Sequence, residues 1–254
     1  VTEFLNCLAG TDRPFARIES KNSFPTGAGL ASSASGFAAL TKAVSCAAGL
    51  DQNTESLSTL ARMGSGSAAR SMHGGYAEMK IGDDAGGSDD YAIQLYDEGY
   101  WDIRLLVAIV SIGSKETGST EGMIRTAETA PYYKAWIESS GTDLVDVRRA
   151  LASRNFTRLG EVAEHSCMKM HGLIMSARPS MLYWEPGTVE LIRTIWDLRS
   201  QGTPAYVTID AGPQVKAICR PQDVDRVKQA LESVPDVIRV IEARPGPGAY
   251  LLNK

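Results

Sequence analysis

The sequence is poor in the residues that most often build metal and nucleophilic sites. It has three histidines and four cysteines in 254 residues, and the cysteines are far apart with no Cys-x-x-Cys spacing. No set of metal-ligating residues is therefore indicated. Gly-x-Ser-x-Gly is also absent, which argues against a serine hydrolase. We expect Cys46 and Cys219, which lie in apolar segments, to be buried thiols, and a reducing cytoplasm suits this cysteine usage best.

Clusters of positive charge and long apolar segments are absent as well. The formal net charge is −4, and no cluster of Lys and Arg occurs, so nucleic acid is not an indicated partner. The longest apolar run, Leu105 to Val110, is far too short to cross a bilayer, and no signal-peptide pattern opens the chain. The length, with 43% apolar and 22% charged residues, suits a globular protein of one large or two modest domains. An anionic small molecule would have to be bound by a few basic side chains and backbone N–H groups.

One Gly- and Ser-rich stretch, Phe24 to Gly36, precedes an apolar-periodic segment and has the composition of a phosphate-binding turn. Gly27 and Gly29 permit positive φ and a close approach of the backbone to a ligand. The N–H groups and the dipole of a helix start favour an anion. The spacing of apolar residues predicts that helix over residues 30–48, with Gly49 at its C′ position. Hydroxyl groups beside the helix start come from Ser32, Ser33 and Ser35.

The stretch has a second interpretation, in which Gly and Ser merely form a turn and small residues merely let a helix pack closely. Neither the Walker A pattern GxxxxGK[ST] nor the dinucleotide pattern GxGxxG is present. Taken alone, the stretch supports phosphate binding and a simple turn about equally.

A second motif, Gly64 to Ser71, has the sequence GSGSAARS. If a helix begins near Ser67, then Ser67 and Arg70 share one face, and Ser65 lies in the turn before them. Hydroxyls and a guanidinium at such a place suit the capture of a carboxylate or a phosphate. The alternative is an ordinary N-cap serine with a solvated arginine.

Two later motifs have the same ambiguity. The loop from Ser114 to Met123, with Lys115 and Ser119, enters a predicted helix and suits phosphate, but Ser or Thr before Glu is also a common cap. Thr208 to Pro213 places Asp210 at the end of a predicted strand before Ala-Gly-Pro. A carboxylate there is a frequent functional acid, and an Asp is equally common as a turn residue.

Together and in this order, the four motifs resemble those of mevalonate diphosphate decarboxylase, a member of the superfamily of galactokinase, homoserine kinase and mevalonate kinase. The family carries Phe-Pro-Thr-x-x-Gly-Leu-Ala-Ser-Ser-Ala, Gly-Ser-Gly-Ser-Ala-x-Arg-Ser, Thr-Gly-Ser-Thr-x-Gly-Met and Asp-Ala-Gly-Pro, and each is present here within residues 22–213. The resemblance implies ATP and Mg²⁺ as cofactors, a phosphorylated small-molecule substrate, a homodimer, and decarboxylation of mevalonate 5-diphosphate to isopentenyl diphosphate. A phosphomevalonate decarboxylase, a pure kinase of the superfamily and a non-catalytic phosphate-binding protein remain alternatives.

The resemblance also implies residue roles. Ser32, Ser33, Ser35 and the two glycines would hold the ATP phosphates, and Ser65 and Ser67 would contact phosphate groups. Arg70 would bind the substrate carboxylate, Ser119 would contact the phosphate end of the substrate, and Asp210 would be the catalytic acid-base residue. The family's upstream segment, with its Tyr-Trp-Gly-Lys-Arg stretch, has no counterpart before Val1, and we expect it to be missing from this chain. His165 and His171 lie on a predicted helix and are expected to be structural.

The alternation of helices and strands predicts an α+β chain with a domain boundary near residues 98–102. The resemblance implies a ribosomal protein S5 domain 2-like N-terminal domain over residues 1–100 and a ferredoxin-like C-terminal α/β sandwich over 101–254. The acidic stretch from Gly82 to Asp90 predicts a surface loop, because the ligand order of an EF-hand is absent. Further strands are predicted at 15–20, 76–80, 102–111, 205–210, 215–219, 237–243 and 249–252, and further helices at about 51–63, 67–73, 121–138, 143–153, 156–174, 188–200 and 221–234.

Overall fold

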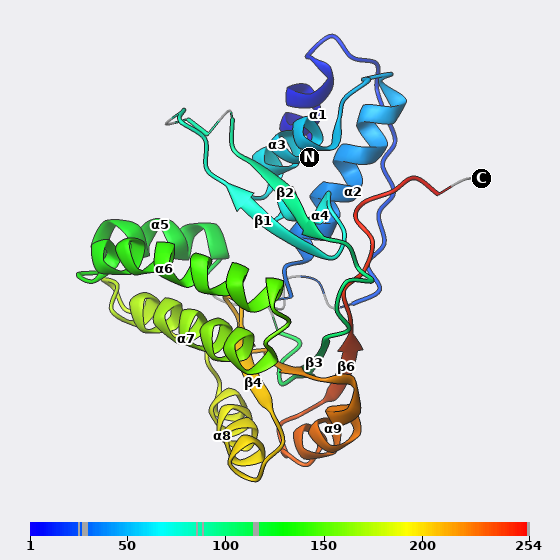
Figure 1. The fold of residues 1–254 in the computed structure, drawn as a ribbon. Coiled ribbons are helices and arrows are strands. Elements are labelled where there is room, and N and C mark those ends of the chain that lie inside the picture. The colour runs from blue at the N-terminus through cyan, green and yellow to red at the C-terminus, as the bar shows by residue number, and fades with distance from the viewer. Residues whose placement is uncertain (25, 27–29, 85, 88, 114–116, 253–254) are drawn as a thin grey trace. The chain divides into compact units, whose positions relative to one another are not determined.

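The computed structural model describes residues 1–24, 26, 30–84, 86, 87, 89–113 and 117–252. The chain forms two compact units, one of residues 1–26, 31–101 and 245–254 and the other of residues 27–30 and 102–244 (Figure 1). The sequence-based division assigned the last ten residues to the C-terminal domain. They belong instead to the first unit, where the N–H of Gly75 donates to the carbonyl of Gly246 at 2.9 Å and the N–H of Ala249 donates to that of Ser71 at 3.0 Å.

The first unit packs helices against an antiparallel hairpin. Its elements are α1 (Thr2–Ala9), α2 (Ser32–Ala47), α3 (Thr54–Gly64), α4 (Ala68–Ser71), β1 (Tyr76–Lys80) and β2 (Tyr91–Tyr96). Its apolar core comes from one face each of α2, α3 and α4, with the buried residues Ala38, Leu57, Ala61, Ala68 and Met72. The buried Ser58 hydroxyl donates to the carbonyl of Ala69 and accepts from the N–H of Ala92, at 2.9 and 2.8 Å. This one side chain therefore joins α3, α4 and β2.

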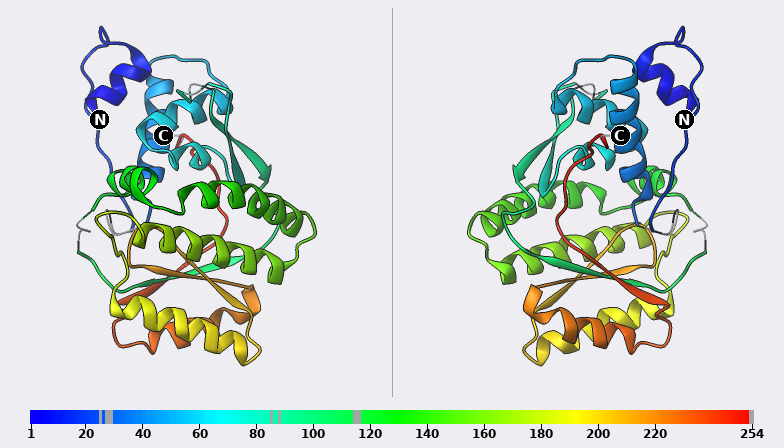
Figure 2. Two further views of the ribbon diagram at one scale, coloured as in Figure 1. Left: turned by 90° about the vertical axis from the view of Figure 1, so that its left-hand side faces the viewer. Right: turned by 90° about the vertical axis from the view of Figure 1, so that its right-hand side faces the viewer.

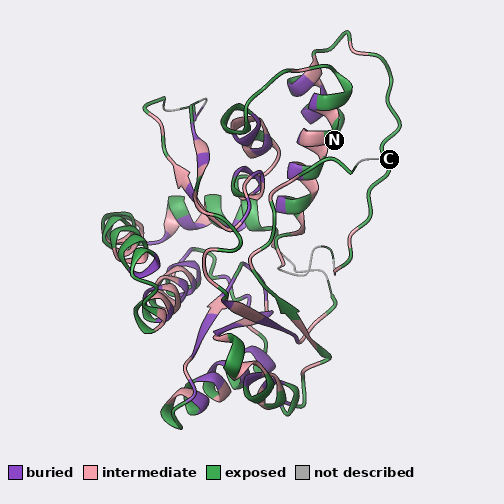
Figure 3. Cartoon of the chain, turned by 45° about the vertical axis from the view of Figure 1, so that its right-hand side comes forward, coloured by how far each residue is buried: buried purple, intermediate pink, exposed green. Residues whose placement is uncertain are grey.

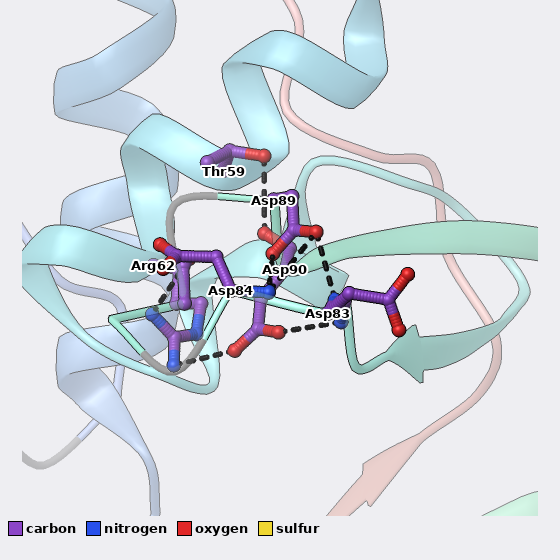
Figure 4. Close-up of polar contacts among 8 residues, drawn as sticks. Thr59, Arg62, Asp83, Asp84, Asp89 and Asp90 are labelled. Carbon is purple, nitrogen blue, oxygen red and sulfur yellow. Dashed lines mark hydrogen bonds and ion pairs between the residues drawn. The ribbon is translucent and has the colours of Figure 1, made fainter.

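Two carboxylates of the acidic stretch, those of Asp89 and Asp90, bond to backbone N–H groups of the loop (Figure 4). Asp89 accepts from the N–H groups of Asp83 and Asp84, at 2.8 and 3.1 Å. Asp90 accepts from the N–H of Gly82 at 2.8 Å and forms an ion pair with Arg62 at 2.6 Å. Among the residues that the structure describes, no group of three or more His, Cys, Asp or Glu side chains is placed to hold a metal ion.

The second unit is a sheet with helices on both sides. Its elements are β3 (Arg104–Ile109), α5 (Ser119–Thr129), α6 (Tyr133–Ala152), α7 (Phe156–Met175), α8 (Pro186–Ser200), β4 (Ala205–Ile209), β5 (Val215–Cys219), η1 (Pro221–Asp223), α9 (Val224–Glu232) and β6 (Arg239–Ala243). The strands are antiparallel in the order β4-β5-β3-β6. This is the split βαβ arrangement of a ferredoxin-like sandwich, so that prediction is confirmed.

The core of this unit lies between the sheet and two helices. Alternate residues of β3, β4 and β5 are buried against α8 and α9, as the period of two in a strand requires. Figure 2 shows α8 and α9 against one side of the sheet and α6 and α7 on the other, and in Figure 3 the inward sides of these elements are the buried ones. The largest completely buried side chains include Leu106, Ile109, Leu191, Ile195 and Leu231.

The predicted helices and strands are mostly present, and the errors have local causes. Residues predicted as one helix over 121–138 form two, since Pro131 separates α5 from α6. The predicted helix over 143–153 is the second half of α6, which runs unbroken through Ser139, Ser140 and Gly141. The strands predicted at 15–20 and 249–252 do not form: within the described residues, neither segment pairs with a neighbouring strand. The strand β2 was not predicted.

The prediction for the cysteines was half right. Cys219 is buried, but Cys46 is exposed because α2 turns the neighbouring Ser45 inward instead. None of the helices in the described residues is long and apolar enough to pass through a bilayer.

Candidate functional site

The predicted phosphate-binding helix begins one residue after an unusual backbone conformation. Ala31, the N-cap of α2, has φ 51° and ψ 38°, the left-handed region, and the cap makes no side-chain hydrogen bond. That conformation is uncommon for a residue with a Cβ and occurs preferentially at functional sites. The N–H groups and the dipole of a helix start favour an anion, and the N-cap Ala31 contributes no side-chain hydrogen bond that would compete with one.

Three serines, one from the first motif and two from the second, form a chain of hydroxyls at this helix start. The Oγ of Ser33, in the first turn of α2, lies 3.0 Å from the Oγ of Ser65, which lies 3.2 Å from the Oγ of Ser67. Ser65 follows α3 in extended conformation, and Ser67 is the N-cap of α4. Tertiary folding thus joins the Gly- and Ser-rich stretch to the second motif. Each hydroxyl both donates and accepts, so the group can reorient its protons around a phosphate.

The other predicted residues of the first unit have different surroundings. Arg70 lies on α4 one turn after Ser67, as predicted, and is exposed. The hydroxyl of Ser35 donates back to the carbonyl of Ser32 at 3.3 Å, so its donor is used within its own helix. Gly27 and Gly29 lie outside the described residues.

The second unit presents Asp210 at the end of β4, an edge strand. Side chains of α7 cover that edge: Glu164 accepts from the N–H of Val207 at 2.8 Å, and the Sγ of Cys167 accepts from that of Ile209 at 3.1 Å. The Nε2 of His171 donates to the carbonyl of Ile209 at 3.2 Å. The residue before Asp210 is therefore bonded to α7 on both its N–H and its carbonyl, which holds the backbone of Asp210 in place.

The buried groups behind Asp210 are neutral near pH 7. Burial lowers the pKa of His171 below its ordinary 6.5, although the bond to the Ile209 carbonyl and the charge of Asp210 act in the opposite direction. Burial raises the pKa of the Cys167 thiol to about 11. Both groups therefore serve as uncharged hydrogen-bonding supports for the end of β4.

The carboxylate of Asp210 bonds to a lysine of the neighbouring strand and is half-exposed. Its side chain is 51% exposed, and its Oδ2 lies 2.6 Å from the Nζ of Lys216 on β5, a side chain that is 13% exposed. The turn after Asp210 is held by Gln214, which is buried, accepts from the N–H of Val110 at 2.8 Å and donates to the carbonyl of Ser111 at 2.6 Å. A half-exposed carboxylate on a supported backbone can meet a ligand without rearrangement.

Ser119 begins α5 and is exposed, with Gly118 as the extended N-cap before it. The start of this helix is held by Tyr183, whose hydroxyl donates to the carbonyl of Thr117 at 3.3 Å. Lys115 lies outside the described residues. Ser119 and Asp210 both belong to the second unit, whereas the serine chain and Arg70 belong to the first.

Lys216 is the residue at this site that the motifs did not indicate. The register of the β4–β5 pair places Thr208 opposite Lys216, so the lysine reaches Asp210 just beyond the end of β4. One signal was available in the sequence: a lone lysine in the otherwise apolar run Val-Lys-Ala-Ile-Cys. A cation there is expected to find a carboxylate nearby.

Comparison with known proteins identifies the family. The model of a diphosphomevalonate decarboxylase-like N-terminal domain matches residues 1–92, and that of the mevalonate 5-diphosphate decarboxylase C-terminal domain matches residues 105–243. The chain belongs to the diphosphomevalonate decarboxylase family. The resemblance indicated by the four motifs is therefore confirmed.

Relatives within the diphosphomevalonate decarboxylase family differ in how much of them the chain covers. The enzyme of Eremothecium gossypii is 36% identical over 201 residues, which are 77% of this chain and 50% of that relative. The enzyme of Candida albicans is 30% identical over 250 residues, which are 91% of this chain and 69% of that relative. The chain thus spans about half of the first relative and about two thirds of the second.

Solved decarboxylase structures share the fold over nearly the whole chain. A complex of a protein named MDDEF with MVAPP, AMPPCP and magnesium has a TM-score of 0.91 and 36% identity, and the match covers 99% of this chain and 77% of that one. Mevalonate diphosphate decarboxylase from Staphylococcus aureus has a TM-score of 0.89 and 33% identity, with 97% and 74% covered. The predicted α+β two-domain fold is therefore confirmed.

The support of Asp210 by His171 makes the stability of the chain depend on pH. The folded pKa of His171 lies below the ordinary 6.5 of an unfolded chain, so between the two values the unfolded chain binds more protons. The stability gained from a neutral His171 is present above pH 6.5 and is lost as the pH falls towards the folded pKa. His171→Gln keeps a donor for the Ile209 carbonyl but cannot titrate. We therefore expect the Tm of this variant to fall less steeply than that of the wild type between pH 7.5 and 5.5. Each kcal/mol of pH-dependent unfolding free energy corresponds to a change in Tm of about 2–4 °C.

The matched control is His165→Gln, because His165 lies on the same helix and is exposed. Scanning calorimetry of the wild type and both variants over this pH range is the measurement. An unchanged pH slope in His171→Gln would show that the imidazole is not held neutral.

Proposed function

We propose that this chain catalyses the ATP-dependent decarboxylation of mevalonate 5-diphosphate to isopentenyl diphosphate, with release of ADP, phosphate and CO₂, in isoprenoid and sterol biosynthesis. The observation that carries this proposal is the match over 99% of the chain to a structure in complex with MVAPP, which is mevalonate diphosphate, and AMPPCP, an ATP analogue, with magnesium. The four motifs support it independently. We further propose that the protein is a cytoplasmic homodimer, as the cysteine usage and the family resemblance suggest.

The residues of the first unit would bind the anionic groups of both substrates. The start of α2, with Ser32, Ser33 and the two preceding glycines, suits the ATP phosphates because it combines helix N–H groups with hydroxyls. Ser65 and Ser67 would contact phosphate oxygens through the same hydroxyl chain. Arg70 would hold the substrate carboxylate, for which the planar guanidinium provides two parallel donors.

Magnesium is expected to bind mainly through phosphate oxygens, as is common for ATP complexes, and the described residues contain no protein cage for it. When bound, it would neutralise charge on the transferred phosphoryl group. The donors near the start of α2 are hydroxyls and N–H groups, which complement phosphate oxygens rather than the metal. The residues present therefore fit a nucleotide that brings its own cation.

The residues of the second unit would carry the chemistry. Asp210 would accept a hydrogen bond from the tertiary hydroxyl of the substrate and orient it for phosphorylation. After phosphate leaves, the same carboxylate would stabilise positive charge on the tertiary carbon. Electrons from the breaking bond to CO₂ would then form the alkene. Ser119, at the exposed start of α5, would contact the phosphate end of the substrate.

The test is the release of ADP and CO₂ from the purified chain with ATP and Mg²⁺, with mevalonate 5-diphosphate and mevalonate 5-phosphate offered separately. We expect equal amounts of ADP and CO₂ from the diphosphate. The same products from the monophosphate alone would reassign the substrate, and ADP without CO₂ would indicate a kinase. No product from a folded chain that binds nucleotide would indicate a binding role.

A further inference from the structure

We propose that Lys216 is a positioning residue that holds the carboxylate of Asp210 in its working orientation; this inference rests on the proposed function. The Nζ of Lys216 lies 2.6 Å from the Oδ2 of Asp210, the distance of a strong charge-assisted hydrogen bond. The bond spans only six residues, yet it depends on the antiparallel register that sets Lys216 on β5 opposite Thr208 on β4.

The two partners differ in exposure, and this indicates which of them meets the substrate. The side chain of Lys216 is 13% exposed and that of Asp210 is 51% exposed. The lysine therefore approaches the carboxylate from the protein side, while the carboxylate itself reaches solvent. A ligand at the surface would contact Asp210, so Lys216 acts through Asp210.

The other ionisable groups around the pair are neutral or already paired. His171 is kept neutral by burial, which lowers its pKa, and Cys167 is kept a thiol by burial, which raises its pKa to about 11. Glu164 of α7 forms an ion pair with Arg199 of α8 at 2.8 Å. Within the described residues, the ammonium of Lys216 is thus the cation bonded to Asp210.

The physical consequence is a fixed carboxylate with one oxygen engaged. The half-exposed side chain would otherwise move between rotamers, and only some of these would direct an oxygen to the tertiary hydroxyl. An ammonium bonded to Oδ2 restricts this movement and stabilises the negative charge that the reaction requires. Loss of the lysine is therefore expected to slow the chemical steps and leave substrate binding largely intact.

The test is a double-mutant cycle with Lys216→Met and Asp210→Asn, assayed by CO₂ release. We expect Lys216→Met to lower kcat by about 10- to 100-fold with KM for both substrates within about threefold. Lys216→Arg, which restores a cation, should recover part of the loss. In the Asp210→Asn background, Lys216→Met should cause almost no further loss, because residues that act as a unit are non-additive.

Lys169→Met is the matched control, since Lys169 is a similarly shielded lysine of the same unit, 18% exposed, and forms an ion pair with Asp143. Its kcat should stay within about threefold of wild type. An equal loss from Lys216→Met in the wild-type and Asp210→Asn backgrounds would overturn the proposal, because it would indicate a general structural effect. Full activity of Lys216→Met would overturn it as well.

Equilibrium unfolding of the wild type, Lys216→Met, Asp210→Asn and the double variant separates this inference from the proposed function. A wild-type chain without turnover would overturn the proposed function, whereas the unfolding cycle still reports whether the two side chains interact. We expect Lys216→Met to destabilise the wild type more than it destabilises Asp210→Asn. Additive changes in the free energy of unfolding would show that the two side chains do not interact, and would overturn the inference.

Discussion

Replacement of Asp210 by Asn is expected to lower kcat for CO₂ release by about 10³-fold or more. Asparagine keeps the shape of the side chain, but it has neither the negative charge nor the basicity of the carboxylate. Both proposed roles of Asp210, in orienting the hydroxyl and in stabilising the cationic carbon, require that charge. ADP and CO₂ should therefore disappear together in a coupled assay.

Asp223→Asn is the matched control for this variant. Asp223 lies in the same unit and forms an ion pair with Arg220 at 2.6 Å, but it has no proposed part in the reaction. Its turnover should remain near that of the wild type. The catalytic assignment of Asp210 would be wrong if Asp210→Asn kept more than a tenth of the wild-type kcat.

The second large effect is expected for Arg70→Met, which should lower kcat/KM for the diphosphate substrate by about 10²-fold. Methionine retains much of the length of the side chain and removes the guanidinium proposed to bind the substrate carboxylate. Arg70→Lys should recover little of the loss, because an ammonium cannot form the two parallel bonds of the planar fork. Affinity for an ATP analogue should change little, since the proposed nucleotide contacts come from α2.

Steady-state kinetics and calorimetric titration with AMPPCP would check this expectation. Arg17→Met is the control, because Arg17 is an exposed arginine of the same unit whose ion-pair partner is Glu19. A similar loss in both variants would attribute the effect to net charge. Weakened AMPPCP binding in Arg70→Met would instead assign Arg70 to the nucleotide.

Sequence patterns predicted structure best where the residues that determine it lie within one helical turn of each other. Gly49, predicted to follow the helix at C′, has φ +66° after α2. The strand predicted at 15–20 failed because alternation alone provides no partner strand. Residues 121–138 were predicted as one helix because the apolar periodicity is strong on both sides of Pro131.

Local residue chemistry was enough to define the motifs, the helix limit at Gly49, and the family to which the motifs pointed. Tertiary structure alone decided how the groups meet. The Ser33–Ser65 contact joins residues 32 apart in sequence, and the bonds from Cys167 and His171 to Ile209 join residues 42 and 38 apart. The physical reason is range: caps and turns act over three or four residues, whereas the packing of α7 on the edge of β4 and the register of β4 with β5 depend on the whole folded unit. That packing and register place His171, Cys167 and Lys216 around Asp210.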